Sequence, residues 1–168
     1  MRRLHTYLVP LLVAGAVLAP AAQAQSSKHK HWPRINGELW INKQDRDTSH
    51  TGTTKNDELL GGHGDDTLIG GRGADVIWGD HKARGNTARQ RDTIDSGPGN
   101  DWVYGSHGRN TIQGGPGFDR IRVWFGRGFV DCGAGRDILY VSRKSDPKVD
   151  RRNCETISHK SARQIGDG

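Results

Sequence analysis

Aspartate recurs through the middle of the chain at one fixed place in a short glycine-rich unit. The clearest unit is residues 70–78 (GGRGADVIW), which directly follows residues 61–69 (GGHGDDTLI). Carboxylate oxygens and the backbone carbonyls of glycine-rich turns are ligands that suit calcium, which accepts six to eight oxygens at variable angles. The aspartates at the sixth position of the unit are Asp57, Asp66, Asp75, Asp92, Asp101, Asp119 and Asp137.

The unit repeats with a period of nine residues, and nine copies fill residues 52–140 with one eight-residue insertion within residues 79–95. A period this short describes a coil of turns and three-residue strands. The eighth position is aliphatic in every copy and predicts the inward-facing core. Its residues are Leu59, Leu68, Ile77, Ile94, Val103, Ile112, Ile121, Val130 and Leu139.

The pattern resembles the RTX calcium-binding nonapeptide, GGxGxDxUx with U a large aliphatic residue, and the resemblance covers roughly half of the chain. It implies an all-β fold, the parallel β-roll, which is a right-handed β-solenoid. In that fold two nonapeptides complete one coil, so alternate copies stack on the same edge. The odd copies then place five aspartates in one file, whereas the even copies lose charge toward the C-terminus, with Asn110 and Gly128 in the last two.

The resemblance also implies where calcium binds: between successive aspartates of the odd copies, held by the carboxylate and by turn carbonyls. One more ion is expected between Asp66 and Asp92, where the insertion widens the turn. No ion is expected at the eighth turn, where Val123, Trp124 and Phe125 replace the glycine pattern. The turn glycines expected to contribute carbonyls are Gly71, Gly73, Gly97, Gly99, Gly115, Gly117, Gly133 and Gly135.

The ends of the chain differ from the repeats. Residues 1–24 have the basic start, short apolar run and small-residue exit of a secretory signal peptide, so we predict cleavage after Ala24 and export; a retained membrane anchor is the alternative. Residues 25–51 are expected to cap the solenoid, with a strand around residues 35–43 that covers the first coil. Residues 141–168 are expected to form a C-terminal cap and a tail that is disordered from about Ser158.

The only two cysteines, Cys132 and Cys154, are expected to form a disulfide in an exported protein. Two unpaired buried thiols are the alternative. A disulfide here would clamp the last coil to the C-terminal segment.

Three further features stand beside the aspartates. His63, His81 and His107 share the third position of even copies and could bind zinc or copper, sense pH, or be turn residues with no shared role. The odd strands present an aromatic outer face, including Trp78, Trp102, Tyr104 and Tyr140, which we expect to pack beneath the terminal segments. A partner such as a glycan is the alternative occupant. Residues 81–91 form a basic loop.

The sequence contains no recognisable nucleophile paired with a base and no metal-binding motif such as HExxH, so it gives no indication of an enzyme. We therefore predict a secreted, non-enzymatic calcium-binding protein with a structural or adhesive role, in which calcium drives folding. The alternative is a module that binds extracellular glycans or anionic polymers through the aromatic face or the basic loop, with calcium as scaffold. No specific nucleic-acid partner and no membrane span after signal cleavage are expected, although the formal net charge is +6.

Overall fold

The computed structural model describes residues 31–82, 85, 89–105, 107–161 and 164. The predicted signal peptide, residues 1–24, lies outside these residues, as does most of the chain end beyond Ser161. Within the described residues, no helix is long and apolar enough to cross a membrane. The described chain is all-β apart from one short 3-10 helix, η1 (Asp146–Lys148).

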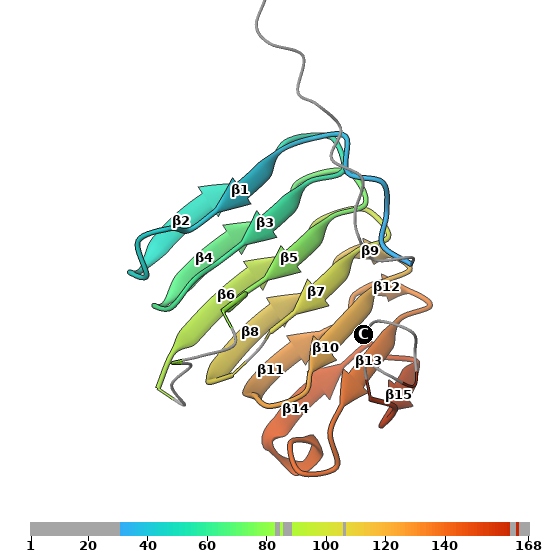
Figure 1. The fold of residues 1–168 in the computed structure, drawn as a ribbon. Coiled ribbons are helices and arrows are strands. Elements are labelled where there is room, and N and C mark those ends of the chain that lie inside the picture. Colours follow the sequence, from blue (N-terminus) through green and yellow to red (C-terminus); the bar gives the residue numbers. More distant parts are fainter. Residues whose placement is uncertain (1–30, 83–84, 86–88, 106, 162–163, 165–168) are drawn as a thin grey trace, which may run out of the picture.

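The strands form two main parallel sheets that face each other across a flattened solenoid (Figure 1). The seven-stranded sheet contains β1 (Leu39–Ile41), β3 (Glu58–Leu60), β5 (Val76–Trp78), β7 (Trp102–Tyr104), β10 (Arg120–Val123), β13 (Ile138–Val141) and β15 (Thr156–Ser158), in that order. The six-stranded sheet runs β2 (Thr48–Thr51), β4 (Asp66–Ile69), β6 (Arg91–Asp95), β8 (Arg109–Gln113), β11 (Arg127–Asp131) and β14 (Val149–Arg152). This is the parallel β-solenoid that the repeat predicts.

The register of the strands follows the parity of the repeats. Of the two main sheets, the strands that follow the odd turns lie in the seven-stranded one and those that follow the even turns lie in the six-stranded one, as in the pairs Glu58 with Val76 and Arg109 with Arg127. The insertion adds its eight residues to the even turn without shifting the register, so Val76 pairs directly with Trp102. Two short strands, β9 (Pro116–Gly117) and β12 (Ala134–Gly135), pair within the stacked odd turns.

The eighth-position residues form the core, and each is at most 1% exposed. Because side chains alternate along a strand, the residue between two outward-facing ones must point between the sheets. The parallel register then places each aliphatic side chain directly over its equivalent in the next coil. Trp40 from β1 and Ile157 from β15 pack against the two ends of this core.

Both terminal segments continue the solenoid. Strands β1 and β2 precede the first repeat and pair with β3 and β4, so the expected strand around residues 35–43 is present and covers the first coil. After the last repeat, β14 and β15 extend the two sheets by a further coil. This last coil has no glycine-rich turn, which is why its sequence showed no repeat.

The aromatic outer face packs intramolecularly. Trp32 lies against Trp78 and Tyr104, with ring centroids 6.2 and 5.9 Å away, and its indole N–H donates to the Tyr104 hydroxyl at 2.9 Å. Ile35, which is 2% exposed, completes a second apolar cluster with Val76 and Trp102. The N-terminal segment therefore covers the middle of the seven-stranded sheet, as expected.

Replacing a core aliphatic should destabilise the solenoid more than replacing its outward neighbour. Ile112→Ala removes a fully buried side chain from the middle of the stack and should lower the free energy of unfolding by about 3 kcal/mol. Thr111→Ala, on the exposed face of the same strand, should change it by less than about 0.5 kcal/mol. Chemical denaturation in the presence of calcium measures both, and equal effects would contradict the assigned core.

Candidate metal centre

The five aspartates of the odd copies lie in one buried file at the turn that precedes each strand of the seven-stranded sheet. Each carboxylate reaches back to the previous coil and accepts a hydrogen bond from a backbone N–H there, which belongs to Glu38 for Asp57 and to the preceding aspartate of the file for the other four. The donor–acceptor distances are 2.8 Å for Asp57 N to Asp75 Oδ1, 2.8 Å for Asp75 N to Asp101 Oδ1, 2.9 Å for Asp101 N to Asp119 Oδ1 and 2.8 Å for Asp119 N to Asp137 Oδ1. All five side chains are 0% exposed.

The second carboxylate oxygen is left without a hydrogen-bond partner in most of the file. This holds, among the described residues, for Oδ2 of Asp75, Asp101, Asp119 and Asp137. A buried carboxylate oxygen without a partner is costly, so this set of atoms requires a proton or a cation. Asp57 differs, because the backbone N–H of Thr53 donates to its Oδ2 at 2.6 Å and the Thr53 hydroxyl contacts both oxygens.

The glycines let the odd turns stack with their carbonyl oxygens pointing toward the next turn. Gly97 and Gly115 have φ angles of 83° and 89°, which favour glycine. A Cβ on Gly97 would lie 2.1 Å from the carbonyl oxygen of Gly71, and one on Gly115 would lie 2.3 Å from that of Gly97. A Cβ on Gly99 would likewise meet the carbonyl oxygen of Gly73 at 1.6 Å and Oδ1 of Asp101 at 2.8 Å. Backbone and side-chain oxygens therefore converge between successive turns.

This donor set is made only of oxygen atoms. No three His, Cys, Asp or Glu side chains group together in the described ranges. Any ion held here must therefore take several ligands from the backbone, which matches calcium coordination and not a site of zinc type.

Residues 51–80 and 89–121 match the sequence profile of the RTX calcium-binding nonapeptide repeat, in four copies. These central coils of the solenoid are RTX nonapeptide repeats. No curated protein and no solved structure shows a significant match to the chain. The periodic register continues past residue 121 to the ninth copy, whose strand β13 pairs with β10 in the same way as the matched copies pair.

Three carboxyl groups of the odd turns, those of Asp75, Asp101 and Asp119, have pKa values raised to neutral pH or slightly above it. Burial is the main cause, and it raises the pKa of Asp75 and Asp119 to about 7 and that of Asp101 to about 8. The backbone N–H bonds oppose this shift, and neighbouring carboxylates in the file add to it. Burial also raises the pKa of Asp137.

The even edge of the RTX solenoid holds a shorter acidic file. Asp66 N donates to Asp92 Oδ1 at 3.2 Å, and Asp92 Oδ2 has no partner among the described residues. Burial raises the pKa of Asp66 to about 6 and that of Asp92 to about 8, with the charge of Asp80 adding to both. Asp80 is 3% exposed and accepts a hydrogen bond from Gln90 at 3.2 Å. Sequence reasoning missed this third carboxyl group because it occupies a glycine position of the repeat.

The three histidines of the even turns make separate local contacts. His63 Nδ1 lies 3.7 Å from Asp45 Oδ1, and His81 contacts the carbonyl oxygen of Gly61. His107 stacks on Phe125 with ring centroids 4.8 Å apart. A transition-metal site built from these three has no support in the described part of the chain.

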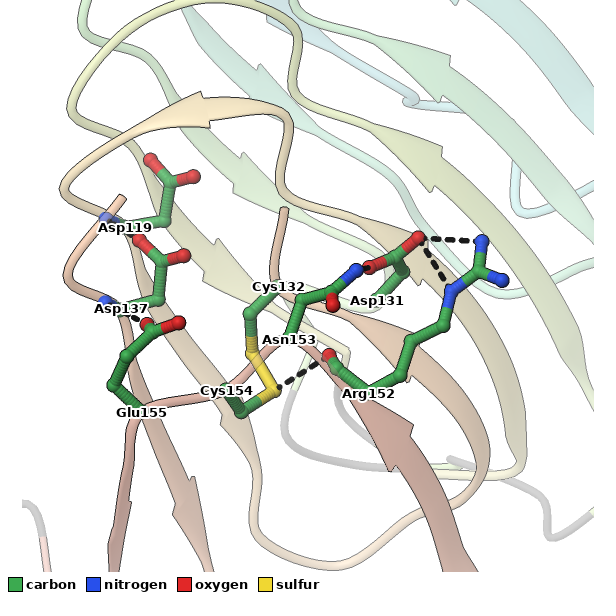
Figure 2. Close-up of a disulfide and its surroundings, with 8 residues drawn as sticks. All are labelled: Asp119, Asp131, Cys132, Asp137, Arg152, Asn153, Cys154 and Glu155. Carbon is green, nitrogen blue, oxygen red and sulfur yellow. Dashed lines mark hydrogen bonds and ion pairs between the residues drawn. A yellow bond between two sulfur atoms is a disulfide. The ribbon is translucent and has the colours of Figure 1, made fainter. Parts of the chain in front are cut away.

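The C-terminal end of the odd file is closed by Glu155, a residue that sequence reasoning missed. Figure 2 shows Glu155 below Asp137, whose backbone N–H donates to Glu155 Oε2 at 2.8 Å. Glu155 follows Asp137 by 18 residues, which is the coil spacing, and that interval is the signal that could have revealed it. The turn before it contains only Asn153 and Cys154, in place of the five-residue glycine turn at residues 132–136.

The predicted disulfide is present between Cys132 and Cys154, with the Cα atoms 5.1 Å apart. Cys132 is 0% exposed and begins the ninth copy, so the bond ties the shortened last turn to the last glycine turn. Beside it, Arg152 and Asn153 both hydrogen-bond the Asp131 carboxylate, at 2.8 Å each. The last coil is therefore held by a covalent bond and by polar contacts between side chains.

Removing the disulfide should loosen this last coil. The double variant Cys132→Ser/Cys154→Ser should be less stable by about 3 kcal/mol, because the bond closes a loop of 22 residues in the unfolded chain. Denaturant unfolding with calcium present measures the difference. Wild-type protein treated with a reductant is the control and should match the variant, and an unchanged midpoint in both would count against a clamping role.

The raised pKa values predict how the calcium-free protein responds to pH. A carboxyl group whose pKa is higher in the folded state binds more protons there, so folding is favoured at low pH and stability is lost as the pH rises through the folded pKa. In EDTA, the strand signal in circular dichroism and the thermal midpoint should therefore increase when the pH falls from 8 to about 5. Calcium affinity should fall over the same interval, because protons compete for the same oxygens.

Asp101→Asn is the matching control for this pH response, since it removes one of the groups with the highest pKa. Its pH dependence in EDTA should be shallower than that of the wild type. If the calcium-free protein instead became more stable as the pH rose from 5 to 8, the raised pKa values assigned to the buried aspartates would be contradicted.

Proposed function

We propose that this protein binds a file of calcium ions between the odd turns of its solenoid, and that the ions complete its folding. The observation that carries the proposal is the row of buried, unpartnered Oδ2 atoms beside turns whose carbonyl oxygens face the next coil. The match of residues 51–80 and 89–121 to a calcium-binding repeat supports the choice of ion.

Each ion would lie between two successive aspartates of the file and take further ligands from the turn carbonyls. The layers concerned are Asp57 with Asp75, Asp75 with Asp101, Asp101 with Asp119 and Asp119 with Asp137. The glycines that would supply or make room for these carbonyls are Gly71, Gly73, Gly97, Gly99, Gly115, Gly117, Gly133 and Gly135. The layer at Asp57 would bind most weakly, because Thr53 already satisfies its carboxylate.

On the even edge we propose one further ion between Asp66 and Asp92. Asp92 Oδ2 is the buried oxygen in need of a partner there, and Asp80 adds negative charge nearby. The edge has no carboxylate after Asp92, because Asn110 and Gly128 take the next two sixth positions. The file of ions would therefore be complete on one edge only.

Calcium binding would stabilise the fold by removing repulsion that the stacking creates. Carboxylates on adjacent coils are separated by one strand spacing of about 4.8 Å, and burial strengthens their mutual repulsion. A divalent cation turns each unfavourable pair into a bridge between layers. The protein would then be a structural or adhesive element outside the cell, with no catalytic role.

The alternative function through the aromatic face has less support. Trp102 and Tyr104 are 6% and 5% exposed, since Trp32 and Ile35 lie over them. A glycan could reach them only if the N-terminal segment left the sheet.

Calcium titration tests the main proposal. The wild-type protein should gain strand signal in circular dichroism cooperatively at calcium concentrations on the order of 0.1–1 mM, and calorimetry should detect several ions bound. Asp101→Asn should bind fewer ions and require more calcium, because it removes the central carboxylate of the file.

The matched control is Asp150→Asn, which removes the same charge from an exposed position within β14, outside the odd turns. It should leave both the stoichiometry and the midpoint unchanged. A strand signal that stays the same in excess EDTA at pH 8, or equal effects of the two substitutions, would refute the proposal.

A further inference from the structure

A second linear array of like charges lies on the edge opposite the odd turns. Strands β6, β8 and β11 lie side by side (Figure 1), and their first residues, Arg91, Arg109 and Arg127, are direct partners in the parallel register. Lys148 continues the array, because it directly precedes Val149, the partner of Gly128. We call these four exposed residues the basic file.

Arg91 and Arg109, the first two residues of the basic file, carry positive charge that the described residues do not neutralise by ion pairing. Neither Arg91 nor Arg109 forms an ion pair within the described part of the chain. Asp65 precedes Arg91 in the same column, but its carboxylate accepts the backbone N–H of Arg91 at 2.8 Å. Like charges directly opposite each other on neighbouring strands are destabilising, so the array favours an anionic ligand that spans several coils.

An exposed aromatic ring lies next to the basic file. Phe125 is 65% exposed, the highest value among the large hydrophobic residues described, and it stacks on His107. These two rings come two residues before Arg127 and Arg109 in their respective turns. The edge thus combines a stacked ring pair with guanidinium groups that repeat once per coil, about 4.8 Å apart.

We propose that the basic file and Phe125 bind a linear acidic polysaccharide, carboxylated or sulfated, that runs along the axis of the solenoid. Guanidinium groups donate paired hydrogen bonds to carboxylate and sulfate oxygens. An exposed ring can pack against the apolar face of a sugar. A polymer whose acidic groups recur along its length can contact one arginine in each of several coils, which a small anion cannot do.

The exposed aromatic content favours a polysaccharide over single-stranded nucleic acid. Binding of successive bases needs several stacking platforms along a groove. Among the residues described on this edge, Phe125 is the one ring that is largely open to solvent, and Trp102 and Tyr104 on the seven-stranded sheet are buried. This site is separate from the odd-edge aspartates and goes beyond the calcium-binding role.

Binding of heparin and of polygalacturonate to the calcium-loaded protein, measured by calorimetry, tests the inference. At least one of these probes should bind with an affinity that falls as salt is added, because the contacts are between exposed charges. Arg91→Gln/Arg109→Gln should weaken binding about tenfold or more, as expected for the loss of hydrogen bonds to charged groups. Phe125→Ala should weaken it by a smaller factor.

The matched control is Arg34→Gln/Arg143→Gln, which removes the same charge from exposed positions outside the basic file and outside the calcium-binding turns. It should bind as the wild type does, and circular dichroism should show all variants folded in calcium. Equal weakening by both double variants, binding of neither probe, or tighter binding of a single-stranded oligonucleotide at the same salt concentration would each overturn the proposal.

Discussion

The fold depends on burying a row of carboxyl groups at a separation of one strand. Each aspartate of the odd turns uses one oxygen to hold the backbone of the previous coil, with donor–acceptor distances of 2.8 to 2.9 Å in four of them and 2.5 Å in Asp57. The other oxygen is then buried without a partner in four of the five residues. The same side chain therefore both aligns the coils and creates a need for positive charge. That need links the stability of the solenoid to protons and to metal ions.

The rest of the molecule supports this arrangement by fixing the coils in register. The aliphatic column is thin, since each copy contributes to it a single eighth-position side chain, so the ends and outer faces matter more than in a larger core. Trp32 and Ile35 cover the middle of one sheet, and β15 with its disulfide closes one end. The two edges have different characters: acidic and buried on the odd side, and increasingly basic and exposed toward the C-terminal part of the even side.

Most of the repeat region, the strand that precedes it and the disulfide could be predicted from the sequence, whereas two carboxyl groups, those of Glu155 and Asp80, could not. Counting the nine-residue copies is enough to assign each aspartate to one of the two edges, because alternate copies are equivalent. Glu155 was not predicted to belong to the acidic file because the turn before it lacks glycine and because the pattern has aspartate, not glutamate, at this position. Asp80 was not predicted to be part of the even edge because it occupies a glycine position of the repeat. Only the folded turn shows that burial raises its pKa.

The sequence by itself determined the period, and therefore the parallel coils, the aliphatic core and the side of the solenoid on which the aspartates stack. These follow from strict spacing, since a regular repeat leaves a stacked chain few registers to adopt. Tertiary structure alone decided which groups lost contact with water and which segments covered the open faces. The unpartnered Oδ2 atoms, the N-terminal cover over Trp102 and the alignment of Arg91 with Arg109 all depend on contacts between residues far apart in the chain.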